Sequence, residues 1–182
     1  MKKFTFLALL FISINAIGQS KYLTKTGSLD FEASVPSFEE VAAKNESVTA
    51  ILNTENGEFA ALALVKAFRF KNALMEEHFN ENYAESDEYP KATFKGKIEN
   101  FDFDTLSETN SYFHIDGSLT FHGVTKNLKG TPLTIKMVDD KIILSGKFKV
   151  MVSDFDIEIP KIVANKLSNE VDIDFRFELV KK

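Results

Sequence analysis

The sequence predicts an all-β fold, a closed antiparallel barrel of about eight strands with one or two short helices over its mouth. The first observation is strict alternation: residues 171–179 read VDIDFRFEL, with apolar side chains at odd positions and charged ones at even positions. A period of two is typical of a strand with one face on a core and the other in water. The second observation is that turn signals separate several such segments. The third is that only two short segments have helical spacing.

About eight strands, each apolar on one face, can close on themselves or fold into two packed layers. Closure leaves no exposed edge and encloses a space for side chains or one small ligand, so we favour a barrel. The expected strands cover residues 27–34, 47–52, 58–65, 92–98, 113–121, 142–150, 155–159 and 171–179. Turn chemistry separates them at Asn56-Gly57, 105–111, 123–127 and Asp139-Asp140. No internal repeat or linker interrupts the chain, so residues 19–182 are expected to form one domain.

Two segments are expected to be short helices. In residues 72–83, Leu74 and His78 stand four apart, as do Met75, Phe79 and Tyr83, which gives one apolar side and one acidic side. The second segment, residues 161–168, follows Pro160. Neither helix is long enough to be stable alone, so each must dock on an apolar surface. The open end of the barrel is that surface, and we expect the first helix to be a plug or lid.

The first eighteen residues have the pattern of a secretory signal peptide. Two lysines precede an apolar run from Phe4 to Ile14, and Ala16-Ile17-Gly18 is a small-x-small cleavage site. We expect cleavage near Gly18/Gln19 and a periplasmic or secreted protein. No segment approaches the roughly 18 uninterrupted apolar residues of a membrane span, so stable membrane insertion is not expected.

Charge and composition narrow the function classes. Removing Lys2 and Lys3 from the 22 basic residues leaves 20 against 27 acidic residues. An acidic chain is a poor partner for nucleic acid or an anionic membrane surface, because both attract clustered Lys and Arg. The chain has no cysteine, which excludes disulfides, zinc-thiolate sites and thiol chemistry.

Several motifs resemble the YceI-like family of exported lipid-binding proteins. They are FRF at 68–70, NALM at 72–75 with HF at 78–79, SDEYPKATFKG at 86–96, GSLTFHGVTK at 117–126, and Phe148 to Ile159 with Asp154, Ile157 and Ile159. The resemblance implies a lipocalin-like eight-stranded barrel whose elongated cavity holds a polyisoprenoid or another long-chain amphiphile. It implies no catalytic residues, so neither an enzyme nor a cofactor is expected.

The residues alone leave open whether the interior is a solid core or a cavity. Fifteen phenylalanines remain outside the signal, and ordinary core packing accounts for any one of them. Gly96, Gly117 and Gly146 stand at inward positions of apolar strands, where a glycine indicates a sharp bend or the close approach of a ligand or another backbone. With the resemblance, these features predict a carrier or store for a long-chain lipid or isoprenoid.

The expected ligand-binding residues are inward-facing strand residues and the apolar side of the first helix. They are Phe68, Phe70, Leu74, Met75, His78, Phe79, Tyr83, Phe94, Gly96, Phe113, Gly117, Leu119, Phe121, Gly146, Phe148, Phe155, Ile157, Phe175 and Phe177. No partner other than the lipid is expected. The sequence leaves open whether the protein forms a homodimer.

The polar residues give weaker signals. His78 could bond a ligand head group or, with more weight, the backbone, while His114 is expected in solvent and His122 is expected to brace a turn. Asp102, Asp104 and Glu108 lack the glycine of a calcium loop, and the three histidines lack zinc spacing, so no metal site is expected.

Two alternative functions remain at this stage. A glycosidase-like enzyme would need paired acids in a cleft, whereas the acids here fall on the water side of the strands. An envelope interaction or stress protein would have a fully packed barrel and no ligand.

Overall fold

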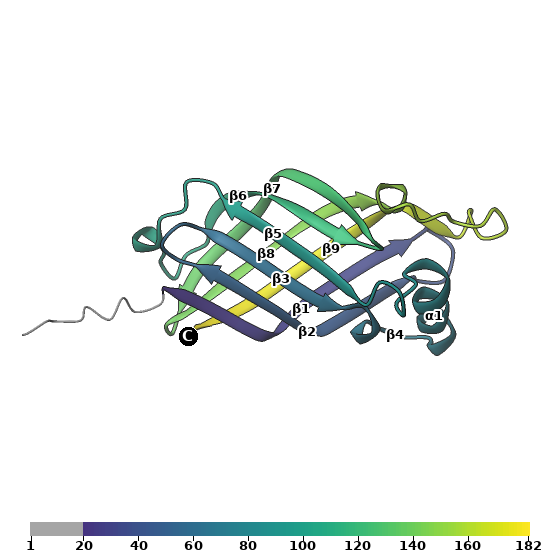
Figure 1. Cartoon of the computed structure of the whole chain (residues 1–182), viewed down its shortest axis with the longest axis horizontal. Coiled ribbons are helices and arrows are strands. Elements are labelled where there is room, and N and C mark those ends of the chain that lie inside the picture. Colours follow the sequence, from purple (N-terminus) through teal and green to yellow (C-terminus); the bar gives the residue numbers. More distant parts are fainter. Residues whose placement is uncertain (1–19) are drawn as a thin grey trace, which may run out of the picture.

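The computed structural model describes residues 20–182, which form the antiparallel barrel that the sequence predicts (Figure 1). Its strands are β1 (Lys21–Ser34), β2 (Ala42–Asn53), β3 (Glu58–Leu64), β4 (Arg69–Phe70), β5 (Lys91–Ile98), β6 (Ser111–Phe121), β7 (Val124–Val138), β8 (Lys141–Met151) and β9 (Leu167–Lys181). The order around the wall is β1-β9-β8-β7-β6-β5-β3-β2, and β2 pairs with β1 to close the barrel. The two-residue β4 pairs only with β2, so eight strands make the wall.

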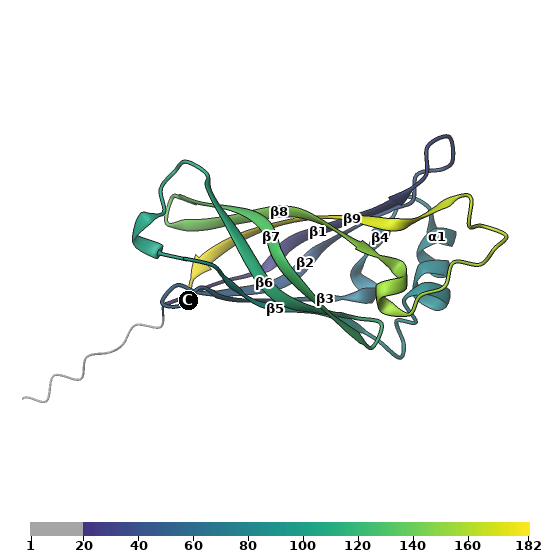
Figure 2. The ribbon, with the colours of Figure 1, turned by 90° about the horizontal axis from the view of Figure 1, so that it is seen from above.

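Helical segments lie at both ends of the barrel. The mouth end carries η1 (Val65–Ala67), α1 (Ala73–His78), the π-helix η2 (Phe79–Tyr83) and η4 (Val152–Phe155), and the opposite end carries η3 (Phe103–Thr105) (Figures 1 and 2). No helix of residues 20–182 is long and apolar enough to cross a bilayer. The expected signal peptide lies outside the described residues.

The first helix is confirmed, and its sequence explains where it begins. Asn72 is the N-cap, and its side-chain oxygen accepts a hydrogen bond from the backbone N–H of Leu74 at 2.9 Å. Arg69 bonds Glu76 at 2.8 Å and ties the helix to β4. Leu74, however, is exposed and lies away from the Met75, Phe79 and Tyr83 side.

Strand β7 is missing from the sequence prediction, which has a long turn at 123–127. The turn contains only His122 and Gly123, both with positive φ as a tight hairpin requires. Further along, the β6–β7 register shifts between Ile115 and Gly117, opposite Gly130, which has φ +58°. On one side of this bulge the even-numbered Leu128 faces inward, and on the other side the odd-numbered Leu133 does. The change of parity hides the period of two.

Two other expectations, both for the segment before β9, are wrong. Residues 155–159 are not a strand, because η4 ends at Phe155 and Asp156 adopts a left-handed conformation with φ +56°. Asp154 holds η4 by accepting from the Met151 N–H at 2.9 Å and by an ion pair with Lys126. Residues 161–166 form turns in place of a second helix.

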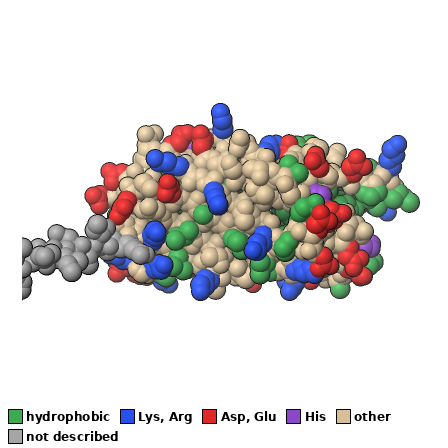
Figure 3. All heavy atoms as spheres, in the orientation of Figure 1, with side chains coloured by type: hydrophobic (Ala, Val, Ile, Leu, Met, Phe, Trp, Pro, Cys, Tyr) green, Lys and Arg blue, Asp and Glu red, His purple; other side chains and the backbone are tan. Residues whose placement is uncertain are grey.

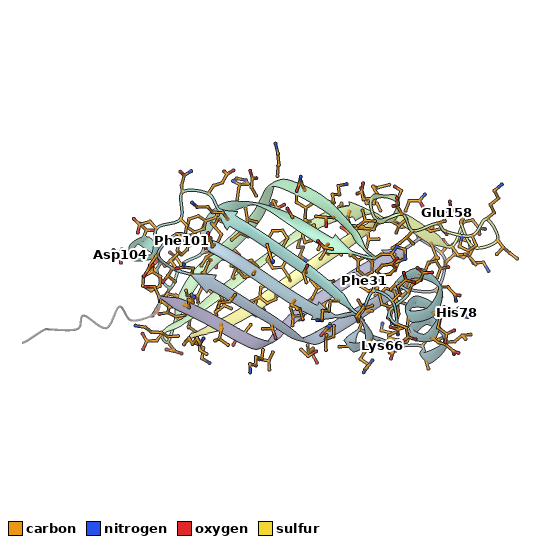
Figure 4. All side chains as sticks on the ribbon, in the orientation of Figure 1. Phe31, Lys66, His78, Phe101, Asp104 and Glu158 are labelled. Atoms are coloured by element: carbon orange, nitrogen blue, oxygen red, sulfur yellow. The ribbon has the colours of Figure 1, made fainter. Side chains whose placement is uncertain are left out.

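The end of the barrel away from α1 has a solid core. Five branched aliphatic side chains there are at most 1% exposed: Leu52, Ile98, Ile135, Ile142 and Leu179. Aromatic rings close this end, where Tyr22 lies against Phe103 with centroids 5.8 Å apart and Phe101 lies against Phe113 at 6.0 Å. Figure 4 shows Phe101 at this end and Phe31 at the other.

Candidate ligand-binding site

The half of the barrel nearest α1 contains a cavity of about 610 Å³. This volume falls within the range of roughly 300–1,000 Å³ that is usual for small-molecule sites. Every strand of the barrel wall contributes apolar side chains to the lining. The alternative of a fully packed barrel is therefore wrong for this half of the molecule.

The floor of the cavity is the boundary with the solid core. On β8 the lining reaches Leu144 but not Ile142, and on β9 it reaches Phe177 but not Leu179. These residues are cross-strand partners, Leu144 with Phe177 and Ile142 with Leu179, so the boundary crosses both strands at one level. Phe59 completes the floor, with its ring 5.6 Å from that of Phe177.

Most of the residues expected from the sequence lie around this one space. The lining contains Phe68, Phe70, Met75, His78, Phe79, Tyr83, Phe94, Leu119, Phe121, Phe148, Phe155, Ile157, Phe175 and Phe177. Five expected residues are not in it: Leu74 is exposed on α1, Phe113 packs on Phe101 at the solid end, and the other three are Gly96, Gly117 and Gly146.

The three glycines make room for rings of the protein itself. Gly96 and Gly117 are cross-strand partners, and a Cβ at Gly96 would lie 2.9 Å from the Phe94 ring. Gly146 faces Phe175 on β9, and a Cβ there would lie 2.6 Å from the Phe175 ring. The close approach that glycine indicates is therefore made by phenylalanine rings and by backbone carbonyl oxygens of neighbouring strands, and the rings lie against the wall and leave the centre open.

One side of the mouth is closed by a cluster of four aromatic rings. Phe79 of η2 lies 5.3 Å from Phe31, 6.0 Å from Phe68 and 5.2 Å from Phe70, measured between ring centroids. Because Phe31 belongs to β1 while Phe70 belongs to β4, the cluster fixes the helical segment on the barrel rim. This is the position that the sequence predicts for a lid.

The other side of the mouth is held by His122. Its Nδ1 lies 2.9 Å from the carbonyl oxygen of Phe155, and its Nε2 lies 2.9 Å from a carboxylate oxygen of Glu85. The Tyr89 ring lies edge-on to the imidazole at 4.8 Å. The expected brace is confirmed, and it connects the β6–β7 turn with η4 and with the segment after η2. His114 is exposed, as expected.

Apart from Thr93 on β5 and Thr131 on β7, the polar side chains of the lining lie at the mouth. Glu39, His78, Tyr83, Lys166 and Ser168 are there, and burial raises the pKa of the Tyr83 hydroxyl. Glu39 is the one acid among the described lining residues, and it accepts a hydrogen bond from Asn72 at 3.4 Å. A search of residues 20–182 finds no group of three or more His, Asp or Glu that could hold a metal ion.

Several lining residues escaped the sequence prediction. Phe31 and Phe59 stand at inward positions of expected strands, so alternation alone could have identified them. Ile159, Val163 and Lys166 come from the irregular segment before β9, for which the sequence wrongly predicts a strand at 155–159 and a helix at 161–168.

Comparison with known proteins gives a family and a fold. The sequence profile of the YceI-like domain matches residues 19–179. No curated protein sequence matches the chain. A polyisoprenoid binding domain from Saccharophagus degradans, implicated in plant cell wall breakdown, has a TM-score of 0.77 at 16% identity, with 90% of this chain and 99% of that chain covered.

Two further structures share the fold. Burkholderia cenocepacia BcnA has a TM-score of 0.68 at 15% identity over 84% of this chain and 96% of its own. The Campylobacter jejuni YceI protein has a TM-score of 0.52 at 16% identity over 98% of this chain and 97% of its own. Since the family profile covers nearly all of the described residues, the chain belongs to the YceI-like domain family.

Proposed function

We propose that this protein binds a long-chain apolar amphiphile, a polyisoprenoid or fatty-acid-like lipid, and stores or carries it in the cell envelope without catalysing a reaction. The observation that supports this most directly is the hollow half of the barrel, with its apolar wall and its polar groups at the mouth. The fold it shares with a polyisoprenoid binding domain supports the same class of ligand.

The energetics of such a cavity suit a carrier. Burying an aliphatic chain contributes about 0.8 kcal/mol per methylene, so roughly fifteen buried carbons contribute about 12 kcal/mol. Association costs on the order of 4 to 15 kcal/mol in lost freedom. The balance gives binding that is micromolar at the tightest, which permits loading and release. Selectivity for chain length is low, because one methylene changes the affinity little.

The proposed location is the periplasm or the exterior of the cell. It rests on the signal-peptide pattern of residues 1–18. Mass measurement of the protein from the exported fraction tests it: a chain that begins near Gln19 supports export, and an uncleaved chain contradicts it.

The binding proposal is tested on natively purified protein. Mass spectrometry of its organic extract should identify a long-chain lipid, and that lipid should displace a fluorescent fatty-acid probe. Ala63→Phe fills the cavity from β3 and should weaken probe binding by roughly tenfold or more, the equivalent of two lost methylene contacts.

Leu64→Phe is the matched control, because Leu64 is the exposed neighbour of Ala63 on the same strand and points away from the cavity. Thermal unfolding of both variants verifies that they fold. Empty protein that binds no probe, or equal probe binding by the two variants, would reject the carrier function.

A further inference from the structure

Three exposed apolar side chains surround the mouth of the cavity. Phe38 is 45% exposed, Leu74 is 56% exposed and Ile162 is 85% exposed. They come from three separate segments, namely the β1–β2 connection, α1 and the segment between η4 and β9. Figures 1 and 2 show all three segments at the same end of the barrel. We call these three residues the apolar rim.

Ile162 is the most prominent member of the rim. The segment that carries it projects beyond the rest of the mouth end (Figures 1 and 2). Ile159 and Val163 of the same segment line the cavity, so its neighbours face the ligand space while Ile162 faces outward. Backbone hydrogen bonds from Val163 to Pro160 at 3.0 Å and from Lys166 to Val163 at 2.8 Å hold it as two consecutive turns.

Charge around the rim is uneven. Lys161 and Lys166 flank Ile162, and within residues 20–182 neither has an ion-pair partner. Of the acids at the mouth, Glu76 is paired with Arg69 and Glu40 with Lys71, while Glu77, Glu81 and Glu158 are exposed and have no ion pair in the described part of the chain. Figure 3 shows acidic side chains at the mouth end and a lysine with apolar side chains on the projecting segment. Residues 160–166 of the projecting segment, beyond Glu158, carry two lysines and no acid, so they are the part of the mouth suited to lipid phosphates.

We propose that the apolar rim docks the mouth of the barrel on the surface of a lipid bilayer, with Ile162 entering the interface and Lys161 and Lys166 contacting phosphate groups. Side chains of this kind bury an apolar part below the head groups and keep an ammonium group at their level. The inference rests on the proposed carrier function and adds where loading takes place. A hydrocarbon chain that passed through water would expose every methylene, whereas a docked mouth lets the chain move from one apolar environment to another.

A bilayer fits the rim better than a protein surface does. The three residues are separate tips around an open cavity, so a rigid protein face would leave the cavity mouth unfilled beneath it. Stable protein interfaces need roughly 800 Å² of closely packed surface on each partner. A fluid lipid surface adapts to separate tips and supplies the ligand itself.

Flotation of the purified protein with vesicles tests the proposal. Vesicles of phosphatidylcholine, with and without phosphatidylglycerol, are mixed with the wild type, Ile162→Ser, Lys161→Gln and Tyr112→Ser, all with the same N-terminus. Tyr112 is the control, because it is 81% exposed on β6 beside Phe113 of the solid end. The Ile162→Ser variant should lose about tenfold or more of its vesicle partitioning, as expected for one buried aliphatic side chain. Lys161→Gln should lose only the part that phosphatidylglycerol adds, and Tyr112→Ser should match the wild type.

Probe binding by the same variants in vesicle-free buffer separates this proposal from the carrier function. Normal probe binding together with unchanged flotation of Ile162→Ser overturns docking and leaves the carrier function standing. If the probe does not bind but flotation depends on Ile162, the carrier function is overturned and docking stands. A wild type that floats with neither vesicle, or equal losses for Ile162→Ser and Tyr112→Ser, also overturns docking and makes a protein receptor the better occupant.

Discussion

The two halves of this barrel are built from the same strands, yet one is solid and the other is hollow. In the solid half the inward positions hold branched aliphatic residues such as Ile135, Ile142 and Leu179, which belong to one core cluster and have almost no exposure. In the hollow half several inward positions hold alanine, among them Ala61, Ala63 and Ala92. The difference teaches that small alanine side chains, together with phenylalanine rings that lie against the wall, leave the cavity open.

The orientation of the phenylalanines completes the explanation. Phe94 and Phe175 would fill the axis if they pointed across it. Instead, their rings lie over Gly117 and Gly146 of neighbouring strands. A cavity forfeits dispersion contacts along its lining, so the hollow half contributes less to stability than the solid half. The solid half then supplies most of the stability that maintains the strand arrangement of the hollow half.

The largest expected effect contrasts one leucine from each half. Leu179→Ala leaves a void in the solid half and should lower the free energy of unfolding by about 2–5 kcal/mol. Leu119→Ala enlarges an existing cavity and should cost less than about 2 kcal/mol, because fewer contacts are lost. Chemical denaturation measures both values. Equal losses would mean that the two halves are packed alike.

The next effect sharpens the role of the glycines. Gly146→Ala brings a methyl group against the Phe175 ring and 2.7 Å from the carbonyl oxygen of Pro132. Overpacking of this kind costs about 1–3 kcal/mol of stability, and a displaced ring would also narrow the cavity. Probe titration and thermal unfolding of the single variant and of Gly146→Ala combined with Phe175→Leu test this. The second substitution should restore part of both properties, and no recovery would show that the Pro132 backbone alone makes glycine necessary.

A smaller effect is expected on ligand release when α1, the lid over the hollow half, is changed. Met75→Asp places a charge on the cavity side of α1 and should speed release of a lipid probe by about tenfold, since a carboxylate in the apolar lining is poorly solvated until the mouth opens. Leu74→Asp, on the exposed side of the same helix, should leave release unchanged. Stopped-flow release and thermal unfolding compare the two properties, and a loss of stability greater than the loss of retention would count against the lid.

The sequence was sufficient for the barrel and for much of its lining, because period-two alternation reports directly which face of a strand is apolar. It failed where backbone irregularity breaks that period. The bulge at Gly130 hid β7, and the apolar positions Phe155, Ile157 and Ile159 imitated a strand in a segment that Asp154 and Pro160 keep irregular.

The division into a solid and a hollow half could not be read from alternation, which is the same in both halves. Phe113 and Phe121 stand on one face of β6, yet the first packs at the solid end and the second lines the cavity. Phe113 packs on Phe101 and Phe121 packs on Phe155, and both partners lie outside the strands, where alternation does not predict them. In the same way, Gly96, Gly117 and Gly146 marked close approach correctly, but the approaching group is a phenylalanine ring that only the register identifies.

The smallest expected effect tests how the irregular side of the mouth is held. The hydrogen bond from Lys126 and the bond from the Met151 N–H keep the pKa of Asp154 below its ordinary value. A depressed folded-state pKa means that this carboxylate stabilises the fold above its ordinary pKa near 3.8, and that the contribution is lost as the pH falls through the folded value. Asp154→Asn should therefore lower Tm slightly at pH 7 and leave it nearly unchanged at pH values well below 3.

The neighbouring Asp156→Asn is the matched control for Asp154→Asn. Residue 156 has a left-handed backbone conformation, which Asn tolerates as well as Asp does. This control removes a nearby carboxylate and leaves the ion pair between Asp154 and Lys126 in place. Because η4 and the segment after it line only the hollow half, Asp154→Asn should also speed probe release at pH 7 while the solid core, followed by hydrogen exchange at Ile142 and Leu179, stays protected. Exchange that rises equally in both halves would mean that the mouth and the core open as one unit, and the contrast between a fixed foundation and a mobile entrance would fail.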